Sequence, residues 1–123
     1  MSEIVTEVVS ITTTGSAGSA TGSGTAPGMN GILLSIFLDF HTSAPATTDV
    51  TIAYQNKGGN ILVASNNATD TLYFPVKQNC DNTGAAVTGV YAQFPLGDGL
   101  SISVAQCDAL TNAVVAYIKY LKV

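Results

Sequence analysis

The residues best suited to nucleophilic chemistry are Asp39, His41 and Ser43, which include the only histidine of the chain. A serine hydrolase needs a base that takes the serine proton and an acid that orients the base. The spacing of two residues places all three side chains along one side of an extended strand, rather than around one substrate. We therefore expect no catalysis here, and we interpret His41 as a residue that packs or hydrogen-bonds at the end of a strand.

The acidic residues are scattered, and most of them neighbour Thr, Asn or Gly, which is typical of side chains that cap turns. No pair stands out as the two carboxylates of a glycosidase. Asp81, Asn82 and Asp98 offer hard oxygen ligands in loops that can converge, although no EF-hand spacing accompanies them. We predict no catalytic residue, no cofactor and no metal, with calcium at these loops as the alternative.

Three further motifs do not predict a functional site. Asn67-Ala68-Thr69 matches a glycosylation acceptor, but no secretory signal accompanies it. The glycines between Gly15 and Gly24 lack the Lys of a phosphate-binding loop. Cys80 and Cys107 are too far apart for a CxxC motif, so we expect free thiols, while a disulfide remains an allowed alternative.

Composition describes a single domain with unusually few charges. The chain has 123 residues, of which 46% are hydrophobic and 10% are charged, and its formal net charge is −4. This length fits one domain over residues 1–123, but ordinary domains are about 25% charged. Such a chain must cover its surface with Ser, Thr, Asn and Gly, or bury much of it against other subunits.

The same composition argues against two classes of partner. Nucleic-acid binding needs clustered Lys and Arg, whereas this chain has no Arg and its four lysines form no run. No apolar run approaches the roughly 20 residues of a membrane span, and the N-terminus lacks a secretory pattern. We expect a soluble protein, made in a cytosol, that binds neither nucleic acid nor membrane.

Alternating apolar and polar residues predict an all-β chain. Turn signals such as Lys57-Gly58-Gly59-Asn60 separate the alternating segments. The expected strands cover 3–13, 20–25, 32–41, 50–55, 61–65, 72–78, 90–94, 100–105 and 112–123. About eight strands at this spacing favour an antiparallel β-sandwich of the jelly-roll type.

The strand over 32–41 has two different faces. Strict alternation places one apolar set on a single face, namely Ile32, Leu34, Ile36, Leu38 and Phe40. The opposite face, which includes Leu33 and Phe37, is half apolar. We therefore expect this strand to lie centrally in its sheet, with contacts on both faces.

The segment from Thr12 to Gly28 consists almost entirely of Thr, Ser, Gly and Ala. One interpretation is a flexible linker, so that residues 1–28 form an N-terminal strand and a Gly/Ser-rich arm. The other is a strand of small residues packed closely against another backbone or a neighbouring subunit. Either way, the segment is too short to separate two domains.

Several stretches resemble small structural proteins of tailed bacteriophages, specifically capsid decoration, or cement, proteins. They are the run from Thr42 to Ile52, Tyr73-Phe74-Pro75-Val76, Asp81-Asn82-Thr83-Gly84 and the run from Ala105 to Tyr117. The resemblance covers most of the chain from Gly31 onward. It implies a β-sandwich that forms a homotrimer and binds the major capsid protein on the outer surface of the virion, where it stabilises the mature shell.

Two segments are the candidates for a capsid or subunit interface. The first is the N-terminal strand, with Ile4, Val5, Val8 and Val9; the second is the turn that contains Pro45, Thr47, Thr48 and Asp49. The rival interpretation for both segments is ordinary stabilisation of the fold.

The alternative function is a virion-attached module that binds carbohydrate or the host, such as a head fibre or tail component. Several aromatic side chains could line a sugar-binding face, but the chain has no Trp. We expect Phe residues in the core and Tyr residues at rims or interfaces. Exposed Tyr and Asn side chains that converge in a groove would favour the alternative, whereas a flat apolar face would favour the capsid.

Overall fold

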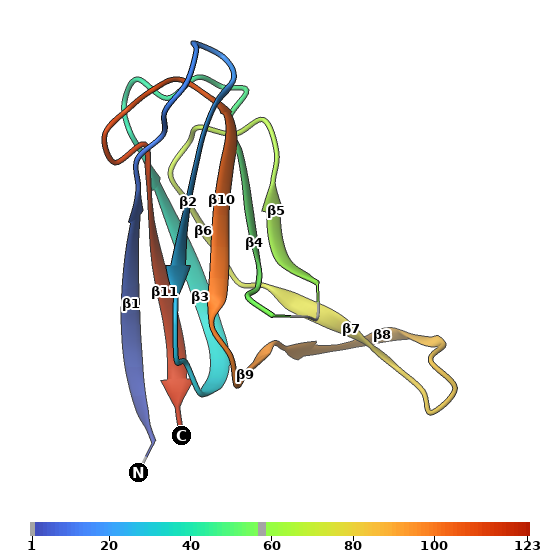
Figure 1. Cartoon of the computed structure of the whole chain (residues 1–123). Coiled ribbons are helices and arrows are strands. Elements are labelled where there is room, and N and C mark those ends of the chain that lie inside the picture. The colour runs from blue at the N-terminus through green and yellow to red at the C-terminus, as the bar shows by residue number, and fades with distance from the viewer. Residues whose placement is uncertain (1, 57–58) are drawn as a thin grey trace.

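The computed structural model describes residues 2–56 and 59–123, and these residues form an antiparallel β-sandwich. Two sheets face each other, and one long hairpin projects from their side (Figure 1). The predicted all-β sandwich is confirmed. Among the described residues there are eleven strands rather than about eight, and no helix that could span a membrane. Lys57 and Gly58, which belong to a predicted turn, lie outside these residues.

Sheet A contains the first and the last strand of the chain and the strand predicted over 32–41. Its order is β1 (Glu3–Ile11), β11 (Val114–Lys122), β3 (Gly31–Phe40) and β6 (Thr71–Tyr73), and β9 (Pro95–Leu96) also pairs with β3. β6 and β9 pair with successive parts of β3, so they share one edge of the sheet. β3 lies between β11 and this edge, which confirms its predicted central position.

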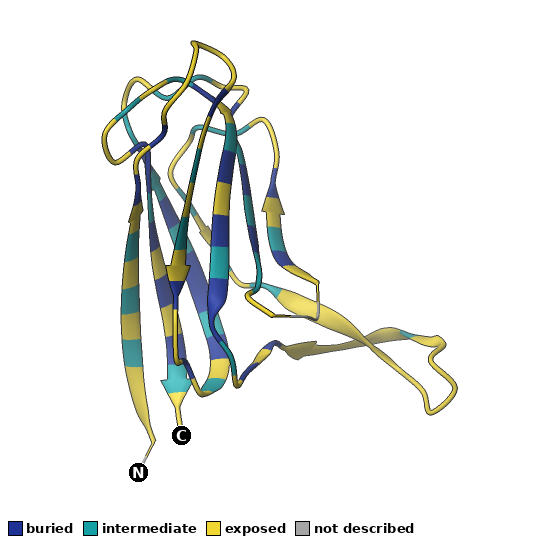
Figure 2. Cartoon of the chain, in the orientation of Figure 1, coloured by how far each residue is buried: buried dark blue, intermediate teal, exposed yellow. Residues whose placement is uncertain are grey.

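Sheet B has the order β2 (Ala20–Ala26), β10 (Leu100–Cys107), β4 (Asp49–Tyr54) and β5 (Asn60–Ala64). The core lies between the two sheets, as the dark strand positions in Figure 2 show. Its largest fully buried side chains are Ile11, Met29, Leu33, Ile36, Leu38, Ile52, Leu100, Ile102 and Ile118. Burial of these aliphatic side chains is the main stabilising contribution to the fold.

The predicted alternation along β3 is right only for its second half. Consecutive residues of β11 pair with Ser35 and Leu33, so Leu34 is an extra residue in the strand. Such a bulge exchanges the faces of the residues that precede it. Leu33 is therefore fully buried, whereas Ile32 is 38% exposed on the outer face.

Within the Gly/Ser-rich segment, Ala20–Ala26 forms β2 rather than a linker, and residues 12–19 form the connection from β1. A Cβ atom at Gly22 would lie 2.5 Å from the carbonyl oxygen of Thr12, and one at Gly24 would lie 2.8 Å from Cγ1 of Val9. Glycine is thus needed for the close approach of β2 to β1. The second interpretation, a strand of small residues against another backbone, describes what is observed.

The projecting hairpin consists of β7 (Val76–Cys80) and β8 (Ala86–Gln93). The predicted strand over 72–78 is split at Phe74 and Pro75 into β6 and β7, because the chain leaves sheet A there. It returns to sheet A at β9, where the backbone N–H of Leu33 donates to the carbonyl of Phe94 at 3.0 Å. β6 and β9 therefore anchor the hairpin at one edge of the sandwich.

Candidate functional site

An apolar row crosses the outer face of sheet A. The strand register aligns Val8 with Tyr117, Tyr117 with Phe37, and Phe37 with Leu72. Partners in an antiparallel pair point to the same face, so these four side chains stand side by side. Val8 is 53% and Leu72 is 50% exposed, and the rings of Phe37 and Tyr117 have centroids 6.1 Å apart.

A second apolar row lies closer to the chain ends. It aligns Ile4 with Leu121 and Leu121 with Ile32. Between the two rows lie Lys119, which is the one charged residue at that level, and its partner Ser35. We call the seven apolar residues of the two rows the sheet A face: Ile4, Val8, Ile32, Phe37, Leu72, Tyr117 and Leu121.

The outer face of sheet B has a different chemistry. Ser23 is aligned with Ser103, and Ser103 with Thr51. A neighbouring level aligns Thr25 with Ser101. These short hydroxyl side chains hydrogen-bond to water without charge. The row continues from Thr51 to Val63, which is 56% exposed. Short hydroxyl groups therefore cover most of the outer face of sheet B, whereas apolar side chains cover most of the outer face of sheet A.

The sheet A face has the properties of a protein-binding surface. Single exposed apolar residues are normal in soluble proteins, but contiguous apolar patches mark interaction sites. Each of the two rows is contiguous, and Thr6, Lys119 and Ser35 separate one row from the other. Aromatic side chains and few charges are also typical of the centre of an interface. The sheet A face extends toward the base of the hairpin, where the chain passes from β6 to β7 and Phe74 is 68% exposed.

The projecting hairpin is exposed along nearly its whole length, as its yellow ribbon in Figure 2 shows. Three large apolar side chains are exposed on it, namely Val76, Val90 and Tyr91. The turn at its tip is held by Asp81, whose Oδ1 accepts hydrogen bonds from the backbone N–H and the hydroxyl of Thr83. These bonds, the hydroxyl first, lower the pKa of the Asp81 carboxyl.

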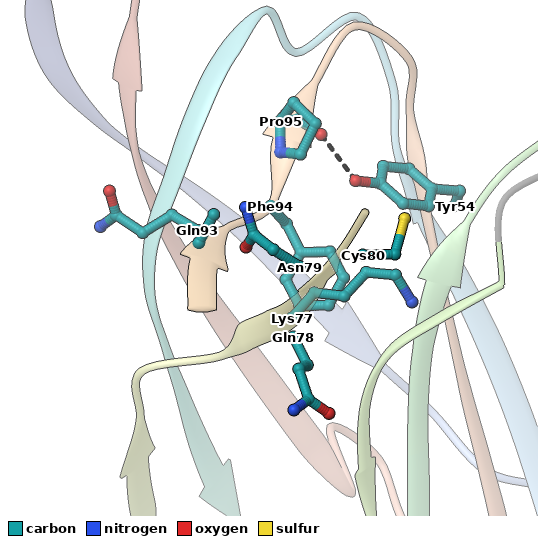
Figure 3. Close-up of a pocket in the computed structure, with 9 residues that line it drawn as sticks. Tyr54, Lys77, Gln78, Asn79, Cys80, Gln93, Phe94 and Pro95 are labelled. Carbon is teal, nitrogen blue, oxygen red and sulfur yellow. Dashed lines mark hydrogen bonds between the residues drawn. The ribbon is translucent and has the colours of Figure 1, made fainter. Parts of the chain in front are cut away.

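A cleft of about 340 Å³ lies where the hairpin meets the sandwich (Figure 3). Tyr54 and Phe94 line it from the sandwich, and Lys77, Asn79 and Cys80 line it from β7. The Tyr54 hydroxyl donates to the carbonyl of Pro95 at 2.7 Å, and partial burial raises the pKa of this hydroxyl. The cleft is thus mostly apolar, with amide and amine groups at its rim.

The predicted interface residues of the N-terminal strand point in two directions. Ile4 and Val8 lie on the sheet A face, whereas Val5 and Val9 pack against the core. Only the first pair is placed to meet a partner. Their role at an interface stays a prediction.

The turn that contains Pro45 and Asp49 uses its polar groups inside the fold. Thr48 is buried, and its hydroxyl donates to the carbonyl of Pro45 at 2.7 Å. The Thr47 hydroxyl donates to the carbonyl of Gln106 at 2.9 Å, and Asp49 accepts from the backbone N–H of Asn66 at 2.9 Å. The rival interpretation, stabilisation of the fold, explains every one of these contacts.

The residues considered for chemistry have structural contacts. Nδ1 of His41 accepts a hydrogen bond from the backbone N–H of Ser43 at 3.0 Å. Asp98 accepts from the backbone N–H and the side-chain amide of Asn56, whereas Asp81 caps the hairpin turn. Over residues 2–56 and 59–123, no three metal-ligating side chains gather as a metal site requires.

The two cysteines differ in environment. Cys80 is exposed on the hairpin, Cys107 is buried in the core, and both are free.

Of the seven residues of the sheet A face, only Ile4 and Val8 were predicted as interface residues. The outward alternation of β1 and β11 was visible in the sequence, but the alignment of residues from four strands was not. The half-apolar second face of the 32–41 strand was the available signal. Three Phe and Tyr expectations are also corrected. Phe37 lies on the outer face of sheet A, Phe74 is exposed because it lies where the chain leaves the sheet, and Tyr120 is buried because it points into the core.

Comparison with known proteins identifies no family for this chain. No protein-family model matches the chain, and no curated protein matches it. Among solved structures it is similar to a variant of a family 29 carbohydrate-binding module, with 14% identity, a TM-score of 0.38, and coverage of 96% of this chain and 79% of that chain. A second variant of that module gives a TM-score of 0.36 at 14% identity and the same coverage. Scores this low support no argument about function.

Proposed function

We propose that this chain is a non-catalytic structural protein of a bacteriophage virion that binds the outer surface of the capsid and stabilises the mature shell. The observation that supports this proposal best is the sheet A face, an apolar surface that crosses all four strand positions of one sheet. The resemblance of the chain to decoration proteins supplies the class of partner. The major capsid protein is thus the proposed partner.

The mechanism is selective binding. A protein that binds the expanded shell better than the immature shell shifts the equilibrium toward the expanded state. The shell gains stability by mass action, and an oligomer that contacts several capsid subunits adds multivalency. No chemical step is needed.

The test uses shells assembled from the major capsid protein of the same phage. We expect the purified chain to sediment with expanded shells and to raise their disassembly temperature. The Leu72→Asp variant should bind the shells at least about tenfold more weakly. Leu72 is 50% exposed, and burial of this exposed half against the shell contributes about 1 kcal/mol to binding. The variant loses this contribution, and its carboxylate must also be desolvated.

The control is Ser103→Asp, which places the same charge on the hydroxyl-covered face of sheet B. It should bind as the unmodified chain does. Absence of binding to expanded shells would refute the proposed function. Equal losses in the two variants would refute the assignment of the sheet A face.

A second candidate, a carbohydrate- or host-binding module, is supported by the cleft and not by the distant likeness to carbohydrate-binding modules. The ring of Tyr54 and the amide of Asn79 line it together with the amine of Lys77, which is a suitable set for a polar ligand with apolar faces. A glycan array would test it. Binding that Asn79→Ala abolishes would favour this candidate over the capsid.

A further inference from the structure

The hairpin lacks the support that a two-stranded ribbon needs. β7 has five residues and β8 has eight, and all of them except Val87 are exposed. A two-stranded hairpin is marginally stable in water unless it packs on another strand or surface. Within the described chain its contacts lie almost entirely at its foot (Figure 1). A contact outside its own sandwich would therefore stabilise the hairpin.

Strand β1 presents a free sheet edge. Among residues 2–56 and 59–123 it pairs only with β11, so one long side of nine residues is left without a strand. Natural edges are protected by lysine, proline, bulges or inward-pointing charges. Of these features, β1 has only an inward-pointing charge. This charge is Glu7, which points toward the interior of the sandwich beside Val5 and Val9.

The charges of strands β1 and β7 are complementary. β1 carries Glu3 and Glu7 and no cation, whereas β7 carries Lys77 and no acid; the one acid of the hairpin, Asp81, lies in the turn and accepts hydrogen bonds from Thr83. Glu3 is aligned with Lys122 of its own sheet, but Glu7 is aligned with Ile118. A strand that carries Lys77 would therefore bring a counter-charge to Glu7.

We propose that the hairpin of one copy adds as a strand to the β1 edge of a second copy of this chain, with Lys77 near the partner's Glu7. The hairpin leaves the sheet at the β6 and β9 edge, and β1 is the opposite edge of the same sheet. A contact between two different edges is heterologous, so successive copies form either a closed ring or an open filament. The pairing satisfies the backbone groups of both edges. With Lys77 beside the inward-pointing Glu7, it places Val76 and Tyr91, which lie on the opposite face of the hairpin, on the outer face of the partner's sheet. It does not depend on the partner of the sheet A face.

Light scattering during size-exclusion chromatography tests this proposal on the purified full chain. The expected mass is a multiple of 12.6 kDa. Replacement of Val76–Gln93 by a short Gly-Ser linker should give a monomer. Because that deletion can disturb folding, charge reversal provides a second test: Lys77→Glu should weaken association at least about tenfold, as should Glu7→Lys.

The double variant K77E/E7K restores opposite charges and should recover most of the association. Ser103→Glu, on the face of sheet B, should leave association unchanged. A monomeric unmodified chain at every concentration would overturn the proposal, as would a hairpin-deleted chain with the mass of the unmodified assembly. A double variant weaker than both single variants would overturn the pairing of Lys77 with Glu7. Failure of capsid binding alone would not affect these results.

Discussion

The close approach of β2 to β1 predicts a strong effect of a single methyl group at Gly22. In Gly22→Ala the new Cβ would lie 2.5 Å from the Thr12 carbonyl oxygen and 2.9 Å from Cγ2 of Ile11. The oxygen belongs to the backbone and cannot rotate away, so the two strands must separate. Overpacking of this kind costs about 2 kcal/mol, which corresponds to a decrease in Tm of roughly 8 °C for a domain of this size.

Thermal unfolding followed by circular dichroism measures this effect, with urea unfolding as a second measure of the free energy. Gly97→Ala is the matched control, because a Cβ there meets nothing within 4 Å and the alanine reduces the entropy of the unfolded chain equally. The control should be as stable as the unmodified protein or slightly more stable. If Gly22→Ala matched the control, β1 would not lie against β2, and the N-terminal strand would be free to act as an arm.

Three further results follow from single contacts. Thr13→Val should lower the free energy of unfolding by about 2 kcal/mol in urea titrations, because the buried hydroxyl bonds two backbone groups of the β10–β11 connection. The hydrogen bonds that lower the pKa of Asp81 stabilise the hairpin turn fully when the pH is above the ordinary carboxyl pKa. Hydrogen-exchange protection of the Thr83 amide should therefore be lost as the pH falls through the lowered pKa of Asp81. Tyr54→Phe should remove the titration, followed by ultraviolet absorbance, of a tyrosine hydroxyl whose pKa lies above 10.0. It should also remove the stability that the neutral hydroxyl provides through its bond to Pro95, which is present below the ordinary tyrosine pKa and is lost as the pH rises through the raised pKa.

Most strands could be predicted because each has its own alternation and its own turn signals. The sequence could not reveal the bulge at Leu34, because an extra residue in an apolar run leaves no mark until β11 is placed beside it. The hairpin was also incompletely predicted. Its second strand begins with Ala86 and contains Gly89, so its first half has no apolar alternation to detect.

The candidate site was harder to predict than the strands. The outward positions of Val8 and Tyr117 follow from their own strands, but their proximity to Leu72 depends on the register of three separate strand pairs. Register is set by the whole sandwich. Local patterns therefore predict which residues face outward, and only the fold shows which of them form one surface.

The low charge of the chain now has a structural explanation. A charge-poor surface must either be hydrated by small hydroxyl groups or be covered by other subunits, and the sandwich separates these two solutions onto different sheets. Ser23, Ser103 and Thr51 give sheet B a face that water can cover. Sheet A carries the apolar rows, the free β1 edge and the β6 and β9 edge from which the hairpin projects. Both proposed contacts therefore use sheet A or its edges, so an assembly built from them leaves the hydroxyl-covered sheet B facing the solvent.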